Sequence, residues 1–196
     1  MARSIFTFDP PERFVAGTVG QPGERTFFLQ ARGGGAVTSV ALEKVQVSVL
    51  AEKVGELLDE VRRRGGDVPA VAAPGSEDVA PLDQPILEEF RVGTMRLAWD
   101  GEDDVVIIEA LAQTGTEGDD ENEEDEDAED DGTADDTEDD LAGPDMLRVR
   151  IDAASARAFV QRAQRVVAAG RPPCPLCGLP LDPEGHVCPR QNGHRH

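Results

Sequence analysis

The sequence predicts an α+β fold in which two strand-strand-strand-helix units pair about a pseudo-twofold axis. Three observations support this fold class. A short motif occurs twice, strand-like segments separated by turn residues follow each copy, and each unit closes with an amphipathic helical pattern. A shorter segment that contains all three cysteines follows the second unit.

The repeat begins with "FVAGT" at residues 14–18, which recurs as "FRVGT" at residues 90–94, 76 positions later. The similarity extends to "ERTFFLQA" at residues 24–31 and "DDVVIIEA" at residues 103–110. We also expect "SIFTF", residues 4–8, to add an edge strand. The repeat therefore predicts three strands in each unit: residues 13–19, 25–31 and 36–42, then residues 89–99, 103–111 and 146–151.

Glycine-containing turns separate these predicted strands. The sequences "QPGE", "RGGGA" and "WDGED" each place a glycine where a hairpin requires a positive φ. The run Gly33–Gly35 also invites comparison with phosphate-binding loops. No helix follows it and it lacks the GxGxxG or GxxxxGK spacing, so a tight hairpin is the better interpretation.

Two helices are predicted, over residues 44–64 and 152–169. Glu43 and Asp152 stand at their starts, where a carboxylate can accept hydrogen bonds from free backbone N–H groups. Gly170 ends the second helix. Apolar residues with helical spacing recur at positions 109 apart, pairing Val47, Leu50, Val54, Leu57 and Leu58 with Ala156, Phe159, Ala163, Val166 and Val167.

A strongly acidic segment interrupts the second unit. Residues 117–140 hold 17 of the 40 acidic residues and no Lys or Arg, which leaves 23 acids against 19 bases elsewhere. The segment has no aromatic residue and no aliphatic residue larger than alanine, so we expect disorder. The predicted organisation is a first unit at 1–64, a loop at 65–85, a second unit at 86–170 with a disordered insert at 113–144, and a tail at 171–196.

The remaining composition limits the class of protein. No apolar run approaches the length of about 18 residues that a membrane span needs, and no basic and then apolar leader begins the chain. We therefore expect no membrane insertion and a cytoplasmic location. An odd number of cysteines that includes a CxxC pair favours a thiolate metal site over disulfides.

The tail has the pattern of a structural zinc site. Cys174 and Cys177 form a knuckle, in which both thiolates can face one ion, and Cys188 supplies a third ligand. For the fourth, His186 can face the same side of an extended segment as Cys188, while His194 has a more relaxed spacing; His196 is the chain terminus. Four protein ligands would leave no position open for catalysis, so the predicted Zn²⁺ is structural.

Four stretches of the chain resemble an actinobacterial family of proteins of unknown function. They are "FDPPERFVAGTVGQPGERTFFLQA", "SVLAEKVGELLDE", "PLDQPILEEFRVGTMRLAWD" and "CPLCGLPLDPEGHVCPRQNGHR". The resemblance implies that His186 is the fourth ligand, because similar proteins have tyrosine at the place of His194. It also implies gene neighbours similar to a histidine phosphatase and a lipid kinase, which suggests a shared pathway but no reaction.

These observations favour a protein-binding or adaptor module over an enzyme. All three histidines lie in the tail, tyrosine is absent, and the two units contain no cysteine. The alternative is binding of nucleic acid or a phosphoryl ligand, because eight arginines but only three acids follow Met146. Against it, we expect the arginines of the second helix on its solvated face. A further alternative is an enzyme that acts on a phosphorylated metabolite, which only the implied gene neighbours suggest.

Overall fold

A computed structural model shows the predicted α+β class, with one mixed sheet of seven strands and two helices. The structure describes residues 3–21, 23–114, 143–170, 174–177 and 190. The strands are β1 (Ile5–Phe8), β2 (Arg13–Val19), β3 (Thr26–Gly33), β4 (Ala36–Leu42), β5 (Glu88–Asp100), β6 (Val105–Ala112) and β7 (Met146–Asp152). The helices are α1 (Lys44–Arg63) and α2 (Ala153–Ala168), and the predicted bounds agree with all of these to within two residues.

The strand order is β1-β7-β6-β5-β4-β3-β2. Strands β2, β3 and β4 form one antiparallel meander and β5, β6 and β7 form a second. Strand β4 joins the two by a short parallel pairing with β5, and the predicted edge strand β1 pairs parallel with β7. This order fits two similar units placed side by side, but their pseudo-twofold relationship stays a prediction.

The sheet is curled. Strands β1 and β2 lie at opposite ends of the strand order, yet only residues 9–12 connect them. A flat sheet of seven strands would separate the outer strands by about 29 Å, whereas the connection from Phe8 to Arg13 can span about 17 Å. The curl brings Phe6 of β1 within 6.5 Å of Phe90 of β5, measured between ring centroids.

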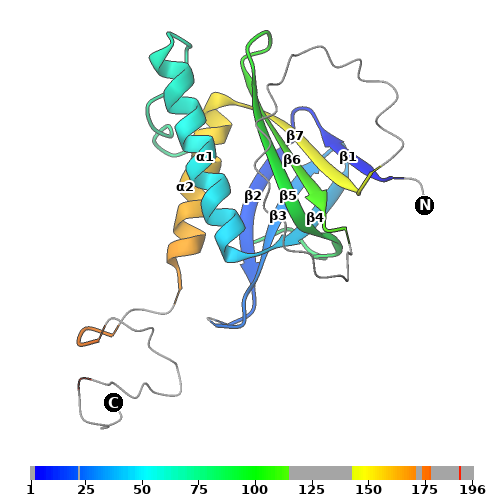
Figure 1. Ribbon diagram of the computed structural model, residues 1–196, viewed down its shortest axis with the longest axis vertical. Helices are drawn as coiled ribbons and strands as arrows, with labels where there is room; N and C mark the ends of the chain where they lie inside the picture. Colours follow the sequence, from blue (N-terminus) through cyan, green and yellow to red (C-terminus); the bar gives the residue numbers. More distant parts are fainter. Residues whose placement is uncertain (1–2, 22, 115–142, 171–173, 178–189, 191–196) are drawn as a thin grey trace, which may run out of the picture.

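Both helices lie side by side against one face of the sheet (Figure 1). The main core forms there, between the apolar faces of the helices and the inward-facing strand residues, with Leu29, Val47, Val106 and Ala156 among its most buried members. A second, smaller core lies on the opposite face of β2, β3 and β4. It consists of Val15, Phe28, Ala41, Leu82 and the partly buried Ile86.

Local capping explains where the helices start. The Asp152 carboxylate accepts a hydrogen bond from the Ser155 backbone N–H at 2.6 Å, as predicted. At α1, Glu43 and Gln46 form a capping box, in which the Glu43 backbone N–H donates to the Gln46 side-chain oxygen at 2.8 Å. Among the described residues, no helix is long and apolar enough to cross a membrane.

The predicted turns are confirmed in two cases and corrected in one. Gly34 and Gly35 have φ values of 58° and 80° between β3 and β4, and Gly20 and Gly23 are also left-handed in the first turn. In "WDGED", residues 99–103, Gly101 is not left-handed. Asp104, the residue that follows, adopts φ 54° instead. The Asp100 carboxylate explains the difference, since it accepts from the backbone N–H groups of Glu102 and Asp103 and moves the left-handed position to the end of the turn.

Candidate functional site

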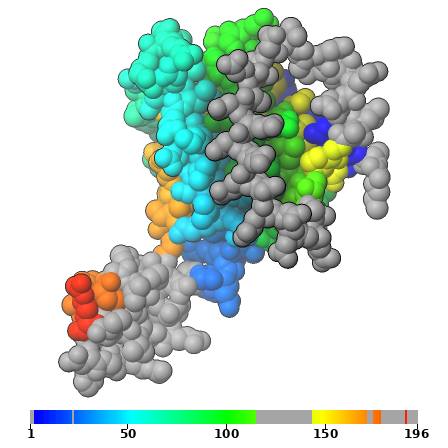
Figure 2. Space-filling view, in the orientation of Figure 1, coloured from blue at the N-terminus to red at the C-terminus, as the bar shows by residue number. Residues whose placement is uncertain are grey.

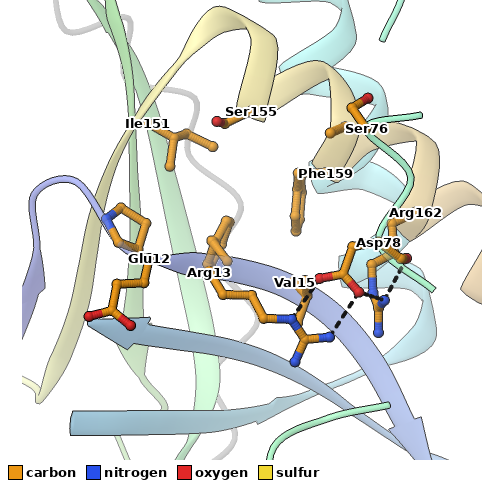
Figure 3. Close-up of a pocket in the computed structure, with 12 residues that line it drawn as sticks. Glu12, Arg13, Val15, Ser76, Asp78, Ile151, Ser155, Phe159 and Arg162 are labelled. Atoms are coloured by element: carbon orange, nitrogen blue, oxygen red, sulfur yellow. Dashed lines mark hydrogen bonds and ion pairs between the residues drawn. The ribbon is translucent and has the colours of Figure 1, made fainter. Parts of the chain in front are cut away.

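The predicted loop after α1 is a strap that runs across the molecule. We call residues 64–87 the strap; it contacts α2, β2 and β3 through an extensive set of polar contacts. At its centre Asp78 lies between Arg13 of β2 and Arg162 of α2, in a cleft of about 220 Å³ (Figure 3). The Phe14 and Phe159 rings stack beside it with centroids 4.8 Å apart.

The two arginines of this cleft donate their hydrogen bonds to other residues of the chain. Arg13 donates to both Asp78 carboxylate oxygens at 2.6 and 2.9 Å, to Asp83, and to the carbonyls of Ala80 and Pro81. Arg162 donates to Asp78 at 2.7 Å and to the carbonyls of Asp78, Ala80 and Ala16. The cleft therefore anchors the strap and offers little to a ligand.

The electrostatics of this cluster agree with that role. The hydrogen bond from Arg13 lowers the pKa of Asp78, and the same bond raises the pKa of Arg13. Burial lowers the pKa of Arg162, whose side chain is 7% exposed. Asp78 thus stabilises a guanidinium that has been removed from water.

The strap fills the seam between α2 and β2. A second seam, between α1 and β5, has no described segment across it. We call it the α1–β5 groove; it has a volume of about 380 Å³ and a mainly apolar lining. Val45 is 70% exposed and Val49 is 45% exposed, although both belong to a helix that packs on the sheet. Figure 2 shows α1, in cyan, at the surface along its length. The groove is lined by Val45, Gln46, Val49, Leu50 and Lys53 of α1 and by residues 93–97 of β5.

One edge of strand β5, with its backbone N–H and carbonyl groups, borders this groove. It pairs with β4 only at Glu88 and Arg91, whereas its pairing with β6 continues to Asp100. Within the described parts of the chain, no strand covers the other edge of β5 beyond Val92. Gln46 of α1 meets this edge at one point, where its side-chain nitrogen donates to the carbonyls of Val92 and Gly93 at 3.2 and 3.1 Å. The following residues form an open strand edge.

The rim of the α1–β5 groove is basic. Lys53 lies 2.8 Å from Glu56 on the next turn of α1, and this hydrogen bond raises the pKa of Lys53. Arg96 of β5 is 69% exposed and lies 4.0 Å from Glu109, and it lines both this groove and the outer face of the sheet. Both cations thus keep exposed donors beside an apolar floor.

A trough of about 500 Å³ crosses the outer face of β1, β7, β6 and β5. Arg148 donates to Glu109 at 2.8 Å, and Arg150 bridges Asp100 and Asp103 at 2.9 and 2.6 Å. The backbone N–H groups of Glu102 and Asp103, followed by Arg150, lower the pKa of Asp100. These opposite charges neutralise one another across the strands.

The expectation that the arginines of α2 face solvent is wrong for two of them. Arg157 is 8% exposed and Arg162 is 6% exposed. Arg157 donates to the Pro69 carbonyl at 2.9 Å and to Asp59 at 2.5 Å, and its hydrogen bond lowers the pKa of Asp59. The physical reason is the strap, whose carbonyl and carboxylate oxygens let guanidinium groups be buried.

The structure describes only part of the predicted zinc site. Cys174 is buried and Cys177 is partly buried, with a turn at residues 175–177. His186, Cys188 and the alternative ligand His194 lie outside the described residues. Among the residues that are described, no group of three or more His, Cys, Asp and Glu could hold a metal ion. The CxxC turn fits two thiolates on one ion, and the full ligand set stays a prediction.

Neither seam was predicted from the sequence. The signal for the α1–β5 groove was present in Val45 and Val49, which are apolar but fall outside the predicted buried face of the helix. The signal for the strap was weaker. Leu82, Asp78 and Asp83 sit among Pro, Ala and Gly in a segment without periodicity, and such a pattern does not indicate what it packs against.

The comparisons with known proteins identify a family. Residues 6–188 match the profile of a family described as Protein of unknown function (DUF3090), so the chain belongs to that family. Neither the curated proteins nor the solved structures returned a match.

Proposed function

We propose that this member of the family is a protein-binding module whose partner docks in the α1–β5 groove. The observation that carries the proposal is the combination of exposed Val45 and Val49 with the open edge of β5. An exposed apolar patch beside an uncovered strand edge suits an added extended segment, because main-chain hydrogen bonds supply affinity and side-chain pockets supply specificity.

Nucleic-acid binding is the weaker alternative. Five of the eight arginines after Met146 form ion pairs with carboxylates of the chain, and two of these five are buried. The two buried arginines are not available to phosphates, and a phosphate would have to compete with a carboxylate for each of the other three. No contact among the described residues favours the phosphorylated-metabolite enzyme over a binding module.

Photo-crosslinking tests the proposed binding role. A photoreactive residue at position 49 lies in the groove, while one at position 71 is a matched control, because Val71 is 72% exposed and does not line the groove. We expect a discrete protein adduct from position 49, formed in living cells, and none from position 71. Adducts from neither position, or equal adducts from both, would contradict the proposal.

We further propose that the tail carries one structural zinc ion, held by Cys174, Cys177, Cys188 and His186. A bound zinc would cross-link a segment too short to form a core of its own. We expect about one zinc per chain by elemental analysis, loss of the metal in Cys174→Ser and His186→Ala, and retention in His194→Ala. Retention in His186→Ala together with loss in His194→Ala would transfer the fourth ligand to His194.

A further inference from the structure

The two seams of the molecule occupy corresponding places in the internal repeat. Each lies between a helix and a strand edge that no described strand covers: α2 beside β2, and α1 beside β5. In each, a helix side chain donates to a strand carbonyl. Arg162 donates to Ala16 at 2.8 Å and Gln46 donates to Val92 at 3.2 Å. Ala16 and Val92 are 76 positions apart, which is the offset of the repeated motif.

The α2–β2 seam shows what such a place accepts. Residues 76–82 of the strap cross it without regular secondary structure. They present a carboxylate, Asp78, to both Arg13 and Arg162, and they offer the carbonyls of Asp78, Ala80 and Pro81 to the same two guanidinium groups. Leu82 then packs against Gly17 of β2. The occupant is therefore an extended segment with an acidic residue followed by an apolar one.

The α1–β5 groove has the matching chemistry without a described occupant. Lys53 of α1 stands 109 positions before Arg162, the same offset that relates the apolar faces of the two helices. Arg96 adds a second cation from β5. Both are well exposed, at 60% and 69%, and Val45 and Val49 lie between Lys53 and the start of α1. A cationic rim and an apolar floor complement an acidic and apolar segment.

We propose that the α1–β5 groove binds an extended acidic segment of a partner protein in the way that the chain's own strap fills the α2–β2 seam. A carboxylate of the partner would pair with Lys53 and Arg96, an aliphatic side chain would cover Val45 and Val49, and its backbone would run along the open edge of β5. This inference rests on the proposed binding role and specifies the chemistry of the partner.

The strap itself supplies the probe. A fluorescent peptide with the sequence of residues 74–87, "PGSEDVAPLDQPIL", is titrated against the full chain and followed by anisotropy. The tethered strap keeps the α2–β2 seam filled because its effective concentration exceeds that of free peptide. We expect saturable binding to the other seam. A peptide carrying Glu77→Gln, Asp78→Asn and Asp83→Asn should bind about tenfold more weakly, as two exposed ion pairs are lost.

Protein variants locate the binding. Lys53→Glu and Val49→Ser should each weaken binding by about tenfold, because the first reverses a rim charge and the second removes apolar contact. Arg64→Glu and Val71→Ser are the matched controls, since both side chains are exposed and neither lines the groove. All four sites are on the surface, so circular dichroism should show the same fold and melting temperature for each variant.

Several results would overturn the proposal. If the neutral peptide bound equally well, or if Lys53→Glu had no effect, the partner segment would not be recognised by its acidic residues. Photo-crosslinked adducts at position 49 would still support the binding role. A dimer in sedimentation equilibrium that Val49→Ser dissociates, with no peptide binding, would assign the groove to a second copy of the chain. If the peptide bound only after residues 116–140 had been removed, the α1–β5 groove would be assigned to the chain's own acidic segment.

Discussion

Two glycines of the repeated motif are fixed by close approach of another segment. A Cβ atom at Gly17 would lie 2.6 Å from the Leu82 side chain, which the strap lays over β2. A Cβ atom at Gly93, 76 positions later, would lie 2.9 Å from the Gln113 Cα atom, where the chain leaves β6. The motif therefore retains glycine because both copies of the strand are covered at that residue.

Gly17→Ala is expected to lower the free energy of unfolding by about 1–3 kcal/mol, the usual cost of overpacking a core. Leu82→Ala will be destabilising alone, but the double variant should be more stable than the sum of the two effects predicts. Urea denaturation followed by circular dichroism measures all three. Strict additivity would mean that the added methyl group does not meet Leu82.

Asp78→Asn is expected to destabilise the protein by about 2 kcal/mol at neutral pH, because it leaves buried Arg162 without its carboxylate. The pKa of Asp78 is lowered in the folded protein, so its contribution is present above the ordinary pKa of about 4 and is lost as the pH falls through the folded value. The stability difference between wild type and Asp78→Asn should therefore shrink below pH 4. A difference that is constant from pH 7 to pH 3 would contradict this role.

At the scale of the elements, local patterns determine most of what forms. The apolar spacing on α1 and α2, the caps at their starts and the Gly34–Gly35 hairpin are each encoded within a few residues, which is why the sequence predicted them. The strap is different. Its course depends on Arg13, Arg157 and Arg162, and each of them lies 65 or more positions away from the strap residues that it contacts.

The cap of α2 provides a test at this scale. Asp152→Ala should cost about 1 kcal/mol of stability, because the Ser155 N–H loses its acceptor. Asp152→Asn keeps an acceptor in place and should cost less. Thermal unfolding of the two variants compares them directly, and an equally large loss in both would point to the negative charge and not to the hydrogen bond.

For the molecule as a whole, the repeat predicted the two meanders but not how they join. The parallel pairing of β4 with β5 uses few residues, and the parallel pairing of β1 with β7 joins residues 141 positions apart. No local pattern specifies either contact. The same limit applies to the candidate sites: the CxxC spacing was visible in the sequence, whereas the α1–β5 groove exists only once two distant elements meet.

Replacing residues 116–140 by a short Gly-Ser linker should change the free energy of unfolding by less than about 1 kcal/mol. This segment has no aromatic residue and no aliphatic residue larger than alanine to bury, and loop length affects closure entropy only weakly. The replacement removes 17 acidic residues, so the isoelectric point must rise. Urea denaturation of both forms makes the comparison, and a large loss of stability would mean that the acidic run contributes to the fold.

The position of β1 has a consequence for synthesis of the chain. Ile5–Phe8 leave the ribosome well before their partner in the sheet, Met146–Val149. Until then the apolar side chains of Phe6 and Phe8 have no sheet to complete. The sheet is therefore expected to close only after β7 has been made, when β1 can pair with it, and pairings over such sequence distances are slow to form.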